Sequence, residues 1–265
     1  MLKQVEFLIQ GYLLPMTIGR LQSSPSFVIE DAIAKKDSRG FFALAYVGVE
    51  DELNFFRKAR SKIDFFLLLH ALITGQAATY LLGAAIPLST FDDLGKNRVT
   101  FPSYEKVIHL NEDMKSELSK PILLTKERFL QLEKHMYRIL DGHVGLALRY
   151  YYRASQASGK RRVAEVVIDL AIAAEALFSS EPPYTANLKR RFSNFIADDE
   201  LERKKIAKRI GEFYSLRGAI VHGVKKKAPI NDIRTASEYV RNVIDKALSS
   251  KLCTKAELIR KADES

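Results

Sequence analysis

The chain has 265 residues, of which 47% are hydrophobic and 28% are charged. This length allows one large domain or two smaller ones with a sizeable buried core, and the composition excludes disorder as the main state. The single cysteine, Cys253, excludes an internal disulfide and a cysteine-cluster zinc site. Because the chain does not start with a basic and then hydrophobic leader that ends in a cleavage site, we expect a cytoplasmic protein.

The first 125 residues have a mixed periodicity, which predicts an α+β region with a small antiparallel sheet. Polar and hydrophobic residues alternate over 4–10, as in a half-buried strand. Two further strand-like runs, 27–29 and 41–49, lie on either side of a polar stretch with turn residues, which indicates a hairpin. A long helix is expected over 52–85. No motif in this region indicates its role.

The segment 65–91 contains no formally charged residue over 27 positions, which is long enough to cross a bilayer. However, His70 and Gly75 interrupt the run, and strand-like segments on both sides make a single membrane span an awkward topology. We therefore favour a helix buried between the sheet and neighbouring helices, with His70 as a core histidine and no membrane association. A membrane span over 65–91 remains the alternative.

Beyond residue 125 the hydrophobic periodicity is helical. We expect helices over 125–154, with an interruption at 141–142, and over 163–178, 184–195, 201–222 and 231–248. Five helices in this order form an antiparallel bundle. The chain is therefore predicted to be mostly α, with an α+β region over 1–125, a helical bundle over 126–250 and a polar tail over 251–265.

The surplus of positive charge lies almost entirely in the predicted bundle. Residues 1–125 contain 14 basic and 14 acidic side chains, whereas residues 126–250 contain 24 basic and 15 acidic ones. A basic half beside a neutral half indicates a polyanion partner such as nucleic acid, or an anionic membrane surface. A solubilising charge that binds nothing is the alternative. The candidate RNA-binding residues are two basic clusters: Lys189, Arg190 and Arg191, and Lys225, Lys226 and Lys227.

Arg217 and His222 form a candidate site near the end of the helix expected over 201–222. Five residues place them about 140° apart on an ideal helix, but a turn at Gly223 would let the His222 ring leave the helix and swing toward Arg217. A helix C-terminus also favours the charged imidazolium. The alternative is that His222 caps the last carbonyls while Arg217 forms an ion pair.

Glu175 is a lone carboxylate within a hydrophobic stretch of the helix expected over 163–178. Burial of an unpaired charge is strongly destabilising, so we expect Glu175 to pair with Arg217. A purely structural salt bridge is the alternative to a role in catalysis.

The segment IDLAIAAEALF (168–178), a basic helix and then FYSLRGAIVHG (213–223) together resemble the Apea-like branch of the HEPN superfamily. The resemblance covers roughly residues 129–250. It implies an all-α bundle that forms a homodimer, in which the Arg-x-x-x-x-His segments of both chains face one cleft. Members of the superfamily are frequent in antiviral and toxin-like defence systems.

Catalytic members of the superfamily are metal-independent RNases, so the resemblance implies that RNA is the partner and that no metal or cofactor is needed. His222 would exchange a proton with the ribose 2′-hydroxyl or the leaving 5′-oxygen, and Arg217 would hold the phosphate, with Glu175 and Tyr214 in support. Active members often have a polar residue directly after the arginine, where this chain has Gly218. Other members are non-catalytic and bind nucleotides, RNA or protein partners, so this second function stays open.

Overall fold

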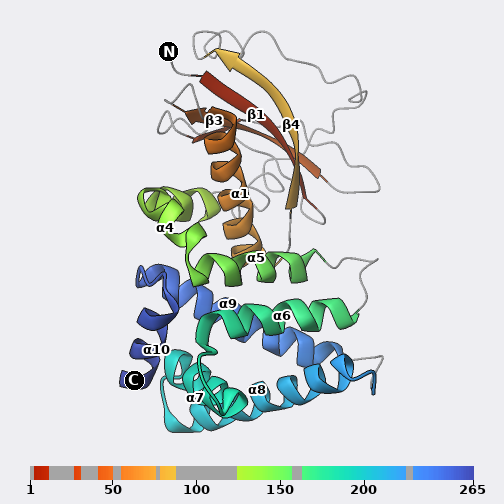
Figure 1. Ribbon diagram of the computed structural model, residues 1–265. Coiled ribbons are helices and arrows are strands. Elements are labelled where there is room, and N and C mark those ends of the chain that lie inside the picture. Colours follow the sequence, from red (N-terminus) through yellow and green to blue (C-terminus); the bar gives the residue numbers. More distant parts are fainter. Residues whose placement is uncertain are drawn as a thin grey trace, which may run out of the picture. The chain divides into compact units, whose positions relative to one another are not determined.

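The computed structural model describes residues 3–11, 27–30, 41–49, 55–75, 78–87, 124–156, 163–224 and 229–265. The chain divides into two compact units, Met1–Gln131 and Leu132–Ser265 (Figure 1). The boundary between them therefore follows residue 131 rather than residue 125.

The N-terminal unit contains a four-stranded sheet with the strand order β2-β3-β1-β4. Its strands are β1 (Lys3–Gly11), β2 (Phe27–Glu30), β3 (Phe41–Val49) and β4 (Ala78–Pro87). All neighbouring strands pair antiparallel, and the register between β1 and β4 shifts between Val5 and Phe7. The first three strands coincide with the runs in which the sequence predicts strands. Helix α1 (Phe55–Thr74) contacts β1, β3 and β4 (Figure 1).

The prediction of one helix over 52–85 is wrong, because the chain changes from helix to strand inside the hydrophobic run. Helix α1 ends at Thr74, and Gly75 follows with a φ of 72°, a left-handed conformation that glycine adopts without a steric penalty. The N–H of Gly75 still donates to the Ala71 carbonyl, and strand β4 then begins at Ala78. Within the described ranges, no helix combines the length and the hydrophobicity that a membrane span requires.

His70 lies in the core of the N-terminal unit, as the sequence predicts. Its side chain is buried, its Nδ1 lies 3.3 Å from Thr125 Oγ1, and its ring stacks on Phe66. Burial lowers the pKa of His70 to about 4, because the charged imidazolium loses its hydration. The ring is therefore neutral at pH 7 and has a structural role.

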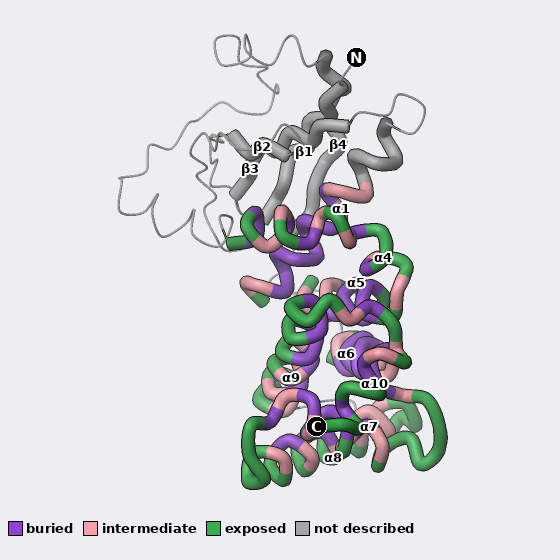
Figure 2. Tube along the Cα trace, turned by 90° about the vertical axis from the view of Figure 1, so that its left-hand side faces the viewer, coloured by how far each residue is buried: buried purple, intermediate pink, exposed green. Residues whose placement is uncertain are grey.

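The C-terminal unit is a helical bundle. Helical turns over 124–132 reach the boundary between the two units. The C-terminal unit then contains the short 3-10 helix η2 (Glu133–His135) and the helices α4 (Met136–Asp141), α5 (His143–Ser155), α6 (Val163–Phe178), α7 (Tyr184–Ile196), α8 (Glu200–Val221), α9 (Ile230–Ser249) and α10 (Lys255–Glu264). Helix α6 contacts α5, α7, α8, α9 and α10, and most of its residues are buried (Figure 2). It is the central helix of the bundle, which explains its nearly uniform hydrophobicity.

Polar residues and glycine define the ends of α8. The Asp199 side chain accepts a hydrogen bond of 2.8 Å from the Glu202 N–H at the start of the helix. At the end, the N–H of Val224 donates to the Ala219 carbonyl and the N–H of Gly223 donates to the Ile220 carbonyl. This pair of bonds is a Schellman motif, and the φ of 73° at Gly223 is the left-handed conformation that the motif requires.

The prediction of a polar tail over 251–265 is wrong, because these residues include helix α10. The Thr254 side chain accepts from the Glu257 N–H, and the Glu257 side chain accepts from the Thr254 N–H, which forms a capping box. Leu258 and Ala262 are buried, and α10 packs against α6 and α7. The helix is polar overall because it shows only a narrow hydrophobic face to the bundle.

Candidate functional site

An ion pair between α6 and α8 forms the centre of the candidate site. Arg217 Nη2 lies 3.7 Å from Glu175 Oε1, so the predicted pairing of these two residues is confirmed. The side chains are 38% and 35% exposed, respectively, so Glu175 is a partly buried charge. The guanidinium is held at the surface of the bundle, where a ligand can reach it.

Tyr214 lies beside this ion pair, one turn before Arg217 on α8. Its Oη donates a hydrogen bond of 3.3 Å to the Ala171 carbonyl of α6. Burial raises the pKa of Tyr214 far above its usual value, and the negative charge of Glu175 raises it further, while Arg217 acts in the opposite direction. Tyr214 is therefore a neutral hydrogen-bond donor that fixes α8 against α6 next to Glu175.

Lys255 adds a second cation near Glu175 that the sequence did not predict. Its Nζ donates a hydrogen bond of 2.7 Å to the Ser179 carbonyl, just after the end of α6. Burial lowers the pKa of Lys255, and the charge of Glu175 partly offsets this effect. No signal in the sequence indicated this contact, because Lys255 lies in the segment expected to be a tail.

His222 lies at the C-terminal end of α8, where its own backbone N–H donates to the Gly218 carbonyl. The carbonyls of Gly218, Ala219 and Ile220 all accept from backbone N–H groups. The His222 ring forms no hydrogen bond with a described residue, so the capping part of the alternative is wrong, whereas its other part, an ion pair formed by Arg217, is confirmed. The residue is exposed, and no other described residue forms a hydrogen bond or an ion pair with its ring, including Arg217.

Gly218 leaves open space next to Arg217. A Cβ atom at this position would have no heavy atom within 4 Å beyond its own stretch of helix. A larger, polar side chain would therefore fit there without moving the bundle. Its absence is a property of this sequence and not a steric demand of the fold.

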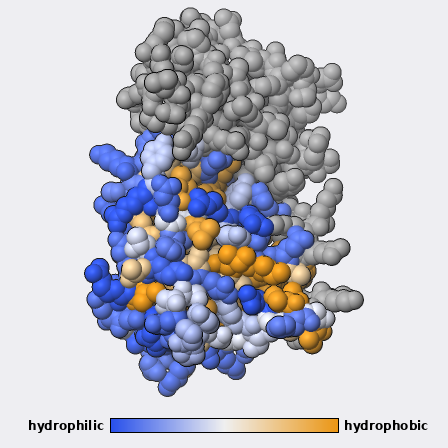
Figure 3. Space-filling model, viewed as in Figure 1, coloured by the Kyte–Doolittle hydropathy of each residue, from blue (hydrophilic) through white to orange (hydrophobic). Residues whose placement is uncertain are grey.

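One face of α6 carries hydrophobic side chains to the surface beside the ion pair. Ala164, Ile168, Ile172 and Glu175 follow each other at helical spacing and are all partly exposed; we call them the α6 face. A band of hydrophobic residues is visible on this side of the C-terminal unit (Figure 3). Val221 and Val224, which flank His222, are 50% and 77% exposed. Exposed hydrophobic groups near a polar site are typical of protein interfaces.

The first basic cluster does not form a continuous RNA-binding surface. Arg191 is only 2% exposed and donates to the Phe178 carbonyl and the Ser180 hydroxyl, at 3.0 and 2.8 Å. The prediction that Arg191 binds RNA is wrong, because its guanidinium is used inside the bundle. Arg190 is exposed and pairs with Asp263 at 2.9 Å, and Lys189 is partly exposed. Lys225, Lys226 and Lys227 lie outside the described residues.

In the part of the chain that the structure describes, no three His, Cys, Asp or Glu side chains are grouped so that they could hold a metal ion. No protein-family model, curated protein or solved structure matches the chain. The function must therefore be argued from the site itself.

Proposed function

We propose that this protein is a HEPN-like, metal-independent endoribonuclease that acts as a homodimer in the cytoplasm, in defence or stress response. One observation carries the proposal: the exposed His222 ring, without a partner among the described residues, lies five positions after a guanidinium that Glu175 holds at the surface. A titratable ring and a two-pronged cation are the two groups that cleavage of a phosphodiester requires.

The proposed reaction is an internal transesterification. The ribose 2′-oxygen attacks the neighbouring phosphorus, the bond from phosphorus to the 5′-oxygen breaks, and the products are a 2′,3′-cyclic phosphate and a 5′-hydroxyl. His222 takes the proton from the 2′-hydroxyl or gives one to the leaving 5′-oxygen. Arg217 binds the phosphate and stabilises the charge that develops on its oxygens. Glu175 and Tyr214 are positioning residues, because they hold Arg217 and α8 in place.

Dimerisation would complete this site. With one histidine per site, a single protomer offers one proton-transfer group, whereas the reaction needs a base for the 2′-hydroxyl and an acid for the leaving oxygen. Three of the four residues of the α6 face are hydrophobic and lie on the helix that pairs with Arg217, and Val221 and Val224, close to His222 in the sequence, are exposed. A second copy seated on this surface would bring two Arg217–His222 pairs to one cleft.

Positive charge on the same helix supports RNA as the substrate. Lys204, Lys205 and Lys208 are exposed on α8, and Lys204 pairs only weakly with the exposed Glu200, at 3.6 Å. If these lysines contact phosphates, binding should weaken steeply as salt rises, because bound counterions are released. Binding that does not depend on salt would contradict this part of the proposal.

Gly218 favours a second candidate function, a non-catalytic module that binds nucleotides, RNA or a protein partner. The open space beside Arg217 lacks the polar side chain that active relatives often have. Gly218→Asn would introduce such a group without a steric clash, so cleavage that is weak in the wild type and rises in this variant would support the catalytic function.

The main test is incubation of the purified protein with mixed RNA in the presence of EDTA. We expect cleavage with cyclic phosphate ends, and we expect His222→Ala to reduce it by about 10²–10⁴-fold. Arg217→Lys should also be poorly active, because a point charge cannot replace a planar fork. His143→Ala, at an exposed histidine on α5, is the matched control and should cleave normally. Cleavage that requires Mg²⁺ or survives His222→Ala would refute the proposed chemistry.

Light scattering tests the dimer. The chain has a mass of 30.0 kDa, so the expected species at micromolar concentration is twice this mass. Ile172→Glu places a charge on the α6 face and should give a folded monomer that no longer cleaves RNA. A wild-type monomer, or a dimer that Ile172→Glu does not change, would contradict assembly through this face.

A further inference from the structure

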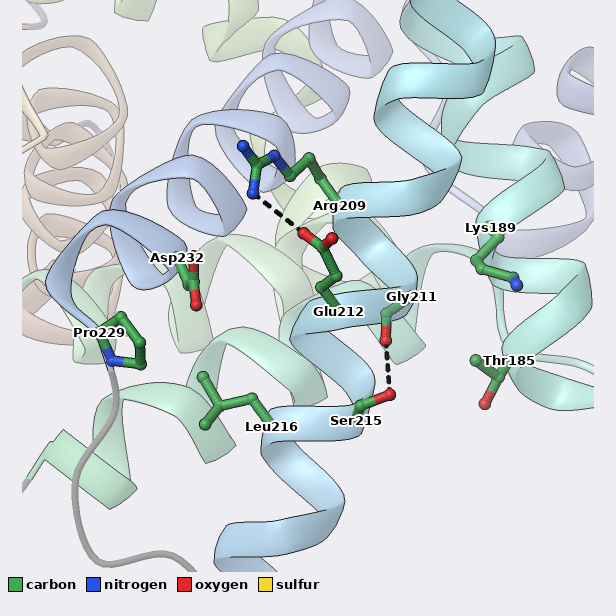
Figure 4. Close-up of a pocket in the computed structure, with 9 residues that line it drawn as sticks. All are labelled: Thr185, Lys189, Arg209, Gly211, Glu212, Ser215, Leu216, Pro229 and Asp232. Atoms are coloured by element: carbon green, nitrogen blue, oxygen red, sulfur yellow. Dashed lines mark hydrogen bonds and ion pairs between the residues drawn. The ribbon is translucent and has the colours of Figure 1, made fainter.

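An open cavity of about 700 Å³ lies on another side of α8, between α7 and α9. Gly211 and Ser215 of α8 line its middle, Thr185 and Lys189 line it on the α7 side, and Pro229 and Asp232 line it on the α9 side (Figure 4). This volume lies within the range of small-molecule sites. Neither Arg217 nor His222 takes part in this lining, so the cavity is distinct from the proposed cleavage site.

The α7 side of the cavity is suited to an anion. The ammonium group of Lys189 has no hydrogen bond or ion pair with any described residue, and Lys189 is only partly exposed. Helix α7 begins after Pro183 without a side-chain cap, so its first turn presents the positive end of the helix dipole near Thr185. A cation, a hydroxyl and this helix end therefore lie together on one side (Figure 4).

Gly211 is what allows Lys189 to lie close to α8. A Cβ atom at residue 211 would come within 3.0 Å of Lys189 Cδ. Glycine in the middle of a helix is unfavourable, and here it makes room for the lysine stem and deepens the middle of the cavity. The glycine and the lysine thus form one local arrangement that serves the cavity.

The α9 side offers a hydrogen-bond acceptor and a hydrophobic edge. The Asp232 carboxylate has no ion pair with any described residue, because the nearby Arg209 pairs with Glu212 at 3.0 Å instead. Pro229 and the hydrophobic Leu216 lie on the same side of α8 as Asp232 (Figure 4). A ligand that fits both sides therefore carries an anion at one end and hydrogen-bond donors beside a hydrophobic group at the other.

We propose that this cavity binds a nucleoside monophosphate unit, either as a free nucleotide or as one nucleotide of single-stranded RNA. Lys189 and Thr185 contact the phosphate, and Asp232 accepts hydrogen bonds from the ribose hydroxyls or from the amino groups of the base. Inorganic phosphate would use only one side of the cavity, and an acidic peptide would meet the carboxylates of Glu212 and Asp232. The site goes beyond the proposed RNA cleavage and does not depend on it.

The test measures binding to the full chain by calorimetry, with the four nucleoside monophosphates, inorganic phosphate and a short single-stranded RNA as probes. The RNA measurements use the His222→Ala protein, so that the probe is not cleaved. Lys189→Met keeps the side-chain stem and removes the charge. We expect it to weaken nucleotide binding about tenfold or more, since a hydrogen bond to a charged group is lost. Lys261→Met, at an exposed position of α10 outside the cavity, is the matched control and should leave binding of the free nucleotides unchanged.

Asp232→Asn tests the other side of the cavity. It should weaken binding of the nucleotides and leave binding of inorganic phosphate unchanged. Free nucleotides that bind as tightly as the RNA identify a soluble ligand, whereas tighter binding of the RNA that Lys189→Met weakens identifies a nucleotide within a strand. The proposal is overturned if no probe binds at millimolar concentration, if Lys189→Met binds normally, or if inorganic phosphate binds as tightly as the nucleotides. None of these measurements depends on cleavage, so the proposed nucleotide binding and the proposed RNA cleavage can be refuted independently.

Discussion

Replacing Arg191 by methionine removes a buried guanidinium and keeps a side chain of similar length. In the wild type the guanidinium donates to the Phe178 carbonyl and the Ser180 hydroxyl, and it also contacts Glu181 at 3.2 Å and Asp263 at 3.4 Å. These bonds connect α7 to the end of α6 and to α10. Their loss leaves polar groups inside the bundle without their donor.

The size of the effect follows from this geometry. The bond to the Phe178 carbonyl joins a charged donor to a neutral partner inside the bundle, and such a bond contributes about 1.5–3 kcal/mol. The bond to Ser180 contributes less, because Ser180 is exposed. The contacts with Glu181 and Asp263 add little, because these carboxylates are 66% and 36% exposed. We therefore expect the free energy of unfolding of the C-terminal unit to fall by about 2–4 kcal/mol, mostly through the loss of the buried bond to the Phe178 carbonyl.

Urea unfolding followed by circular dichroism measures this change. With a slope of about 2 kcal/mol per molar urea, the midpoint should fall by roughly 1–2 M. Arg190→Met is the matched control, because Arg190 is 48% exposed and pairs with the same Asp263. It should lower the free energy of unfolding by less than about 1 kcal/mol. A loss in Arg191→Met as small as in the control, together with weaker RNA binding, would refute the structural role of Arg191.

Three further substitutions test other parts of the structure. Backbone hydrogen bonds hold the pKa of Glu257 at about 2. The stabilisation by the Glu257 carboxylate is therefore complete above its ordinary pKa of 4.5 and is lost as the pH falls toward 2. Glu257→Gln should be less stable than the wild type at pH 7, and urea titrations should show that the variant has lost this part of the pH dependence. Gly211→Ala should raise the melting temperature, since alanine favours the helix by about 1 kcal/mol, and weaken nucleotide binding by displacing Lys189. Glu175→Gln should change stability by less than about 1 kcal/mol, because the pair with Arg217 is about one-third exposed, and should lower the rate of RNA cleavage at saturating substrate.

The helices of the bundle were predictable because local signals mark their ends. The expected helix over 163–178 coincides with α6, and the turn expected at Gly223 follows the end of α8. Aspartate before a helix acts through a hydrogen bond to a nearby backbone N–H, and glycine after a helix acts by adopting the left-handed conformation. Both effects are local, so they can be recognised without knowledge of the tertiary fold.

The change from α1 to β4 was not predictable in the same way. The run 65–91 is hydrophobic without a clear period, and such a run is compatible with a buried helix and with a buried strand. Gly75 was visible as an interruption, but its left-handed conformation appears only in the structure. The start of α10 is the opposite case, because Thr254 and Glu257 form a capping signal that is present in the sequence and is sufficient to predict a helix there.

The basic run at residues 189–191 shows why a charge pattern does not define a surface. Consecutive residues of a helix point about 100° apart. Lys189 accordingly lines the cavity, Arg190 pairs with Asp263 at the surface, and Arg191 lies in the core. The pairing of Glu175 with Arg217 could be predicted, because a lone carboxylate in a hydrophobic helix restricts the choice of partner.

The contacts of α10 also have a consequence for the order of folding. Arg138 of α4 and Glu257 of α10 are 119 positions apart in the sequence, but Arg138 Nη2 lies 2.6 Å from Glu257 Oε1 in the bundle. Bringing the two ends of such a long loop together costs chain entropy before the contact between α4 and α10 can stabilise the bundle. We therefore expect α10 to dock after the folding transition state. Substitutions on α10 should then accelerate unfolding and leave the folding rate almost unchanged. The helix that closes the bundle would thus control how long the native state persists, rather than how fast it forms.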